Sequence, residues 1–455
     1  MKLLHIDTDL KRFETPQGTL TLVSVFIPFF IEMLLMNLMG TVNTVTLGHY
    51  SDDAVAAVGA ANQIITMVLT FYAVISSGAS IVISHNLGAK KNNLASDAAF
   101  SAIVFSLLIS LLIGTTLTFF SRPILTLMNI KGTVLEYATS YLSICIFFSF
   151  MQALISAFSA IFRSYGFTKT AVYVSLFMNA MNAILNIIIV YRPIETPLHG
   201  VTGIAIANTI SRLLALLLFI FLLMKSPITL NLRSKKLKSL KTIFRILYIG
   251  VPGGIGSISY SASQVVSTSI IAILGSNTMS ANIYLTTIFF YVYVIGMSLG
   301  LAGSLITGWL VGAGEFDKAY RLGNQNLRIA IIMNVIISVS IYLLGVPILG
   351  LFTHNPDIIS IAKTILLIDI FVEFGRAFNH VISNALRGAG DVLYSMVVSI
   401  VSCWAIGILL SYILCIHLGL GLAGCWIAFA IDESFRGLLY YHRFRTKKWT
   451  KKALI

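Results

Sequence analysis

The sequence SHNLGAKKNNLASDA (84–98) decides the fold class, because its pattern returns in GWLVGAGEFDKAYR (308–321). Each copy closes a long apolar segment with a Gly-Ala pair and then continues into a charged stretch. The copies align when Gly88 is placed on Gly312, which sets an offset between an early and a late part of the chain. The two copies therefore indicate that the chain contains an internal repeat.

Two further pairs of segments follow the same order along the chain. FRSYGF (162–167) and LRGAGD (386–391) align at the identical offset, with Arg163 on Arg387. GVTGIAIANTISR (200–212) and GLAGCWIAFAIDE (421–433) align at a slightly shorter one. The order and near-constant offset indicate two related halves, an architecture known in transporters whose site lies between the halves.

The composition places these halves in a membrane. The chain has 455 residues, of which 57% are hydrophobic and 11% are charged, whereas soluble domains carry about 25% charged residues. Apolar stretches of bilayer-spanning length recur throughout. We predict an all-α polytopic membrane protein with 12 transmembrane helices in two pseudo-symmetric six-helix bundles. The expected spans are 18–48, 54–87, 95–121, 134–163, 168–191, 200–224, 244–274, 279–312, 318–352, 357–387, 390–417 and 420–442.

The basic residues set the predicted orientation. The net charge is +14, and the bases gather in the loops on one side of the spans, which argues for a cytoplasmic face and against nucleic-acid binding. We expect a multi-pass protein of the cytoplasmic (inner) membrane, without a signal peptide, with both termini cytoplasmic. The expected parts are a cytoplasmic segment 1–17, a lobe 18–224, a basic linker 225–243, a lobe 244–442 and a basic tail 443–455.

Soluble chemistry is not predicted. The four cysteines lie in apolar segments without CxxC spacing, so we expect neither a zinc site nor a structural disulfide. The sequence contains no GxxxxGK[ST] loop for ATP. We therefore expect no enzyme and no cofactor. The expected partners are a small organic molecule and the lipid bilayer, and the chain is expected to be a monomer.

Several motifs resemble the multidrug and toxic compound extrusion family, in its bacterial form. They include GTVNTVTLGHYSDDAVAAVGAANQI (40–64), NAILNIII (182–189), GVPGGIGS (250–257) and the repeated motifs quoted above. The resemblance spans nearly the whole chain. It implies a twelve-helix carrier that exports organic cations or other amphipathic compounds while sodium ions or protons move inward.

The resemblance also implies a cation site, at which this sequence departs from the family pattern. Asn43 stands where many members carry an aspartate, and Pro28 matches a family proline fifteen residues earlier. The other implied positions, in the fifth and sixth spans, are also amides: Asn182, Asn186 and Asn208. A sodium ion near Asn43 and Asn186 is the metal site that the resemblance would imply.

Glu32 is an ionisable residue inside the first predicted span, one turn after the helix-bending Pro28. It shares a helical face with Asn43, but the two are about 16 Å apart along the axis. Charged residues within spans often mark ion or substrate pathways. Glu32 either takes part in coupling or pairs with a neighbouring base near the headgroups.

The tenth predicted span carries a polar stripe. Its members recur every three or four residues and therefore share one helical face: Asp369, Glu373, Arg376, His380, Asn384 and Arg387. Such a face must contact protein or water rather than lipid. One reading is a structural ion pair between Glu373 and Arg376. The other is a proton- or cation-responsive network with His380 titrating near neutral pH. A simpler alternative for Lys363 and Asp369 is a position nearer the outer interface.

Other polar residues suggest a substrate surface. Tyr260, Gln264 and Tyr291 could line a cavity and hold an organic cation through their rings and amide, or could serve helix packing. Asp432, Glu433 and Arg436 either line the cavity or, as expected here, form an interfacial cluster with nearby bases. Tyr260 stands eight residues after Pro252, where other members of the family keep a glutamate.

The resulting hypothesis is a secondary active multidrug exporter coupled to protons or sodium ions, working by alternating access. Its predicted coupling residues are Glu32, Glu373, Arg376 and His380. The alternative is a flippase for a lipid or a lipid-linked sugar, which would need unpaired bases within the spans. A membrane enzyme or scaffold is a third class, but it would need a clustered catalytic motif, which only the tenth span approaches.

Overall fold

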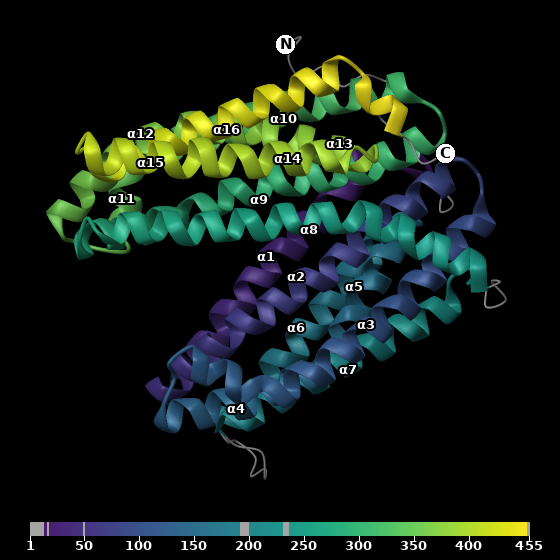
Figure 1. Ribbon diagram of the computed structural model, residues 1–455, viewed down its shortest axis with the longest axis horizontal. Coiled ribbons are helices and arrows are strands. Elements are labelled where there is room, and N and C mark those ends of the chain that lie inside the picture. The colour runs from purple at the N-terminus through teal and green to yellow at the C-terminus, as the bar shows by residue number, and fades with distance from the viewer. Residues whose placement is uncertain (1–12, 16–17, 49–50, 192–199, 231–235, 453–455) are drawn as a thin grey trace. The chain divides into compact units, whose positions relative to one another are not determined.

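The structure, a computed structural model, describes residues 13–15, 18–48, 51–191, 200–230 and 236–452, and these are mostly helical (Figure 1). Within those ranges the side chains of residues 14–15, 36, 38–48, 52, 190–191 and 236–239 are not described. Most of the predicted segment 1–17, part of the predicted linker and the Asn43 side chain lie outside the described residues. A short hairpin of β1 (Phe13–Thr15) and β2 (Gly18–Leu20) precedes the first helix.

The helices follow one another with short connections. In chain order they are α1 (Leu22–Gly48), α2 (Asp52–Gly88), α3 (Asn92–Leu127), α4 (Gly132–Phe147), α5 (Ser149–Ser164), α6 (Thr168–Tyr191), α7 (Gly200–Lys225), α8 (Lys236–Ala272), α9 (Ser276–Gly312), α10 (Phe316–Leu343), α11 (Gly345–Gly350), α12 (Pro356–Phe378), the π-helix η3 (Asn379–Ser383), α13 (Asn384–Gly388), α14 (Val392–Ser402), the π-helix η4 (Cys403–Ile408), α15 (Leu409–Tyr412), the π-helix η5 (Ile413–His417), α16 (Gly421–Arg445) and the 3₁₀ helix η6 (Lys448–Lys452).

Each predicted span coincides with one helix or with consecutive helices. The fourth span is α4 and α5 with a bend of 45° between them, and the tenth is α12, η3 and α13. Within the described residues, eight helices are long and apolar enough to cross a membrane, and the bent pair is a ninth candidate. Three predicted spans do not meet this criterion in the described part of the chain. One is α1, of which only the shorter apolar part Leu22–Leu35 meets a weaker length limit, and the others are the charged helices α12 and α16. The all-α, multi-pass prediction is confirmed.

The backbone repeats as the sequence does. Lys90 and Gly314, which the alignment of Gly88 with Gly312 pairs, both adopt left-handed conformations, with φ of 56° and 77°. Gly166 and Gly390, which the same alignment pairs, also do so, with φ of 96° and 94°. Equivalent hydrogen bonds close the first two turns, from Lys90 N to Leu87 O and from Gly314 N to Val311 O. The sequence repeat is therefore a repeat of turn geometry.

The chain divides into two compact units. The amino unit comprises Ile31–Ile83 and Lys91–Val251, and the carboxy unit comprises Met1–Phe30, Ser84–Lys90 and Pro252–Ile455. The predicted lobe boundaries, 18–224 and 244–442, stay a prediction. In the amino unit α3 packs on α4 and α5, and α7 packs on α4 and α6, around an apolar core. In the carboxy unit α12 packs against α9, α10 and α16 (Figure 1).

Two glycines explain why residues 84–90 belong to the carboxy unit. A Cβ atom on Gly88 would collide with the carbonyl oxygen of Trp309, and one on Gly312 would collide with that of His85. The ends of α2 and α9 thus meet backbone to backbone, so the two copies of the motif pack on each other. His85 Nε2 also lies within hydrogen-bond distance, 2.7 Å, of Gly388 O.

Large apolar side chains cover the outside of both units. On α3, for example, Leu112 is 62% exposed and Phe119 is 84% exposed. A surface of this kind needs lipid rather than water around it.

Candidate functional site

The polar stripe of the tenth span lies along α12 and its continuation. Asp369, Glu373 and Arg376 belong to α12, whereas His380 lies in the π-helix η3. A π-helix inserts an extra residue into the turn and is frequent at functional sites. The stripe faces protein, because Asp369 and Glu373 are both completely buried. The prediction that this face avoids lipid agrees with that burial.

Arg376 links the stripe to α16. Its Nη1 donates a hydrogen bond to Glu373 Oε1 at 2.6 Å, and its Nε lies 3.9 Å from Glu433 Oε1. The Glu373–Arg376 pair of the sequence analysis is therefore present. The same guanidinium also approaches a second acid on another helix.

Arg436 holds both acids of α16. Its Nη2 lies 2.8 Å from Asp432 Oδ2 and 2.7 Å from Glu433 Oε1. Asn379 of η3 donates a hydrogen bond to Glu433 Oε2, and Ser402 donates one to Asp432 Oδ1 at 2.5 Å. These carboxylates are 4% and 6% exposed, so they are buried within the carboxy unit beside bases, and their depth in the membrane stays a prediction.

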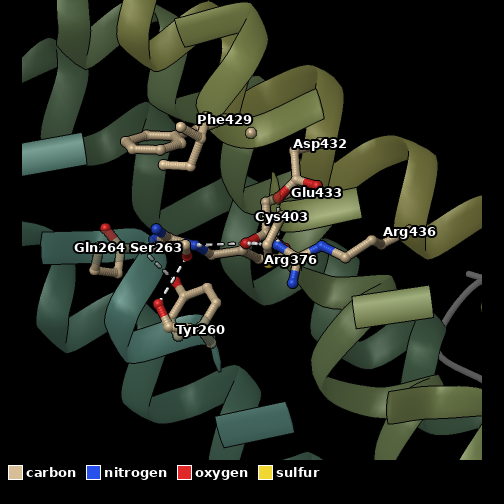
Figure 2. A pocket seen from close by; sticks show the side chains of 11 residues that line it. Tyr260, Ser263, Gln264, Arg376, Cys403, Phe429, Asp432, Glu433 and Arg436 are labelled. Carbon is tan, nitrogen blue, oxygen red and sulfur yellow. Dashed lines mark hydrogen bonds and ion pairs between the residues drawn. The ribbon is translucent and has the colours of Figure 1, made fainter. Parts of the chain in front are cut away.

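This network borders a small pocket with a cavity volume of about 10 Å³, which is room for about one water molecule (Figure 2). Figure 2 shows side chains of α8, α12, η4 and α16 around it. The lining residues are Tyr260, Ser263, Gln264, Arg376, Cys403, Gly407, Ile408, Phe429, Asp432, Glu433 and Arg436. Two arginines face two acids, so the formal charges of the lining cancel.

The aromatic and amide wall of the pocket comes from α8. Gln264 Nε2 donates a hydrogen bond to Tyr260 Oη at 2.8 Å, and the Arg436 guanidinium lies 5.8 Å from the centre of the Tyr260 ring. The ring therefore already faces a cation, as cation–π contact requires. Tyr291, by contrast, is 55% exposed and is not among the residues that line this pocket.

Asp369 has surroundings unlike those of the other acids. Ser338 of α10 reaches Asp369 Oδ2 only at 3.4 Å, and Asp369 Oδ1 has no hydrogen-bond partner among the described residues. Asn334, one turn before Ser338, donates to Glu373 Oε2 at 3.2 Å and leaves its own Oδ1 without a partner in the described structure. Among the described residues, Asp369 is thus a buried carboxyl without a base, and its depth in the membrane stays a prediction.

Among the described residues, His380 forms no ion pair with an acid. Its ring meets Tyr293 of α9 edge to face, with 4.9 Å between ring centres, and its Nε2 has no partner among the described side chains and backbone groups. The carbonyl of His380 accepts a hydrogen bond from Asn384 Nδ2 at 2.7 Å. The insertion at η3 thus places His380 against α9.

In the amino unit Glu32 is paired. Its Oε2 accepts a hydrogen bond from Arg163 Nη1 of α5 at 2.5 Å, and both side chains are just under one-fifth exposed. This is the second of the two readings of Glu32, a contact with a neighbouring base. Pro28 lies inside α1, as expected, and the helix continues through it.

Three of the four implied amides lie together. Asn182 Nδ2 donates to Asn208 Oδ1 at 2.5 Å, and Asn186 Nδ2 donates to Asn182 Oδ1 at 3.0 Å. Asn208 Nδ2 in turn donates to Tyr141 Oη at 3.0 Å. The chain of amides is buried and uses two of its oxygens as acceptors. The side chain of Asn43, the fourth amide, lies outside the described residues, and a cation at these amides stays a prediction.

Sequence reasoning missed Asn334 and Ser338. Both lie one turn apart on α10 opposite Asp369 and Glu373. The signal was an Asn and a Ser four residues apart in an otherwise apolar segment, NVIIS (334–338). It is weak, because small polar residues are common in membrane helices.

A family model and similar sequences point to the same family of transporters. The family model described as MatE matches residues 28–188 and 252–413. The chain is 34% identical to an uncharacterized transporter, YisQ, of Bacillus subtilis, over 96% of each chain. It is 25% identical to a probable multidrug resistance protein, NorM, of Thermotoga maritima, over 98% of this chain and 96% of the other.

Solved structures share the fold. One, described as an outward-facing multidrug resistance MATE family transporter, matches with a TM-score of 0.87 and 21% identity over 98% of each chain. Another is a transporter of Pyrococcus furiosus, for which a reversed polarity of the binding pocket is described as suggesting a different function. It matches with a TM-score of 0.85 and 21% identity over 95% of this chain and 96% of the other.

Proposed function

The chain belongs to the MatE family of multidrug and toxic compound extrusion transporters, and from this premise we propose that it is a secondary active exporter of amphipathic organic cations. We place it in the cytoplasmic membrane as a monomer with both termini inside the cell. The coupling ion is a proton or a sodium ion, and no catalytic step or cofactor is involved.

The observation that carries the proposal is the shared carboxylate of Glu433. It receives Arg436 at 2.7 Å and Arg376 at 3.9 Å, and it lies on the wall of the pocket. The pocket is small in the described state, so an organic cation would need it to open before competing with these arginines for Glu433. Tyr260 and Phe429, which line the same pocket, offer rings to its apolar part.

A proton on Glu373 would act on the same group. In the described state Glu373 holds Arg376 at 2.6 Å. Neutralising Glu373 would release Arg376, which already approaches Glu433, to pair with it. Proton uptake and cation binding would then oppose each other at Glu433, which is the relation that antiport requires, because each ligand must favour a different state.

In the amino unit, we propose a protonation role for Glu32 and a substrate- or sodium-binding role for the amides. Protonation of Glu32 would release Arg163, which it holds at 2.5 Å. Asn182, Asn186 and Asn208, with Asn43, would orient the substrate or hold a sodium ion weakly. His380 lies in η3 against Tyr293, so a change in the conformation of η3 would change the contact between these two rings.

The flippase alternative would need surplus positive charge for a lipid-linked anion. Arg376 and Arg436 each lie beside carboxylates, so the pocket supplies no such surplus. Because the formal charges of the lining cancel, the pocket offers no surplus negative charge for a cation either. The preference for cation export therefore rests on the family of the chain.

The test uses the purified protein in liposomes loaded with ethidium, with a proton gradient or a sodium gradient imposed separately. We expect one of the two gradients to drive ethidium transport. Glu32→Gln and Glu373→Gln should each lower the gradient-dependent rate at least tenfold. Glu136→Gln, which changes an exposed acid of α4, is the matched control. Normal transport by both glutamine variants would refute this assignment of the coupling residues.

A further inference from the structure

The end of the chain carries bases on a fixed support. Segment 445–452 follows α16 and contains η6. Its basic side chains are all exposed: Arg445, Lys447, Lys448, Lys451 and Lys452. A flexible tail would not pack against the rest of the protein. Here the backbone that carries these bases is packed against the carboxy unit.

Trp449 anchors the segment. It is completely buried, with its ring 5.4 Å from the stacked ring of Phe444 and 6.1 Å from that of Phe316. Its Nε1 donates a hydrogen bond to Phe444 O at 2.9 Å. The indole thus has both an apolar site and a polar partner, which is what a buried tryptophan requires.

The chain reverses at Lys447 to bring Trp449 inward. Lys447 has φ of 51°, a left-handed conformation that is costly for a lysine. Past the turn, the carbonyl of Lys452 lies so close to Gly390 that a Cβ there would be 2.8 Å from it. Phe444 stacks on Tyr320 of α10 at 5.3 Å. The segment is held by α10 and by the turn before α14.

The nearby acids leave most of these bases without partners. Asp317 pairs with Lys447 at 2.5 Å, Glu315 with Lys318 at 3.0 Å, and Asp391 with Arg443 at 2.7 Å. Among the described residues, no ion pair is formed by Arg445, Lys448, Lys451 or Lys452. Four bases held close together raise the local positive potential, which favours an anionic partner.

The position of the segment identifies that partner. On α16, Leu438 is 64% exposed and Phe435 is 43% exposed, as expected for side chains that meet lipid. Arg445 follows Leu438 by two helical turns, or about 10 Å along the helix axis. On the neighbouring α14, Leu393 and Val397 are also exposed. The bases therefore lie just beyond an apolar surface, at the depth of lipid headgroups.

We propose that segment 445–452 is a preformed binding surface for the headgroups of anionic phospholipids. Basic clusters next to a membrane helix attract anionic lipids at the cytoplasmic surface. Because Trp449 and the Lys447 turn fix the backbone, less ordering entropy is lost on binding than a disordered tail would lose. This proposal rests on the membrane-spanning fold and not on the transport activity.

The test measures the thermal unfolding midpoint of the full chain in detergent micelles doped with increasing phosphatidylglycerol. We expect a rise in the midpoint that saturates and that shrinks with added salt. Lys448→Gln/Lys451→Gln/Lys452→Gln should weaken the apparent affinity on the order of 100-fold. The triple arginine variant at these positions keeps the charge and should retain the rise.

The control removes three exposed bases elsewhere, as Arg122→Gln/Lys131→Gln/Lys363→Gln. It should keep the phosphatidylglycerol response. An unchanged response in the 448/451/452 glutamine variant would overturn the proposal. So would an equal rise with phosphatidylcholine, or with inorganic phosphate alone, because the ligand would then not be an anionic lipid.

Discussion

Glu373 and Asp369 show how two acids of one helical face can differ. Both are completely buried and lie one turn apart on α12. Glu373 holds Arg376 at 2.6 Å, whereas Asp369 has only the distant Ser338 hydroxyl, at 3.4 Å. An uncompensated charge inside a protein is strongly unfavourable. The two residues should therefore respond in opposite ways when their charge is removed.

Glu373→Gln should destabilise the protein, because Arg376 loses its close partner and keeps only Glu433, 3.9 Å away in the described state. Breaking a buried pair from one side costs about 3 kcal/mol. Asp369→Asn keeps the shape and removes an unpaired acid, so its unfolding midpoint should stay the same or rise. Both midpoints can be measured by thermal unfolding in the same detergent. A large drop in the unfolding midpoint of Asp369→Asn would show that the Asp369 carboxylate has a partner.

The break between α12 and η3 is a feature of whole elements. Gly300 of α9 lies against η3, where an added Cβ would collide with His380 O and come within 2.9 Å of Asn384 Nδ2. The irregular helix therefore fits the neighbouring helix only because this position has no side chain. The fit also fixes the place of His380 relative to the acids.

Gly300→Ala should push α9 away from η3 and cost about 2 kcal/mol through overpacking. Gly350→Ala in α11 is the control, since nothing lies within 4 Å of its Cβ position. Thermal unfolding of the two variants compares them directly. If Gly300→Ala and Gly350→Ala were equally stable, moving α9 away from η3 would not change the free energy of unfolding.

The two turns of the repeat that contain Gly314 and Gly390 allow a comparison of backbone strain with and without a nearby contact. Gly314 and Gly390 both have left-handed backbones, but only Gly390 is also crowded, by Lys452 O at 2.8 Å. Gly314→Ala should cost about 1 kcal/mol from backbone strain alone. Gly390→Ala adds the collision with the carboxy-terminal segment and should cost about 3 kcal/mol.

The Gly390→Ala variant should also loosen the carboxy-terminal segment. Limited proteolysis beyond Arg445 measures this directly, with Gly314→Ala as the reference. Faster cleavage is expected only in Gly390→Ala. Identical cleavage in both would argue against docking of the segment at that turn.

At the scale of the whole molecule, the predicted orientation can be tested by labelling. The four natural cysteines are all buried, so background labelling by a membrane-impermeant maleimide should be low. In intact cells Lys131→Cys should be labelled and Lys452→Cys should not, because bases gather on the cytoplasmic side. Both lysines are exposed in the structure, so a difference reports the membrane side. The reverse pattern would invert the topology.

The candidate site was predictable only in part. Glu373 and Arg376 are three residues apart on one helix, so their pairing follows from helix geometry. The partners on α16 do not, because Glu433 belongs to a helix far along the chain and its depth depends on packing. The same holds for Asn334 and Ser338, which acquire meaning only opposite Asp369.

The sequence by itself determined the membrane class, the helical nature of the apolar segments and the repeat, because apolar length, charge and glycine turns act over short distances. Tertiary structure decided which charges are compensated: Glu32 by Arg163 and Glu373 by Arg376, but Asp369 by no base in the described residues. It also turned the acids of α16 inward to the pocket and anchored the basic end through Trp449, which stacks on Phe444. Such outcomes depend on which helices pack together, and the spacing of residues along one helix does not specify that.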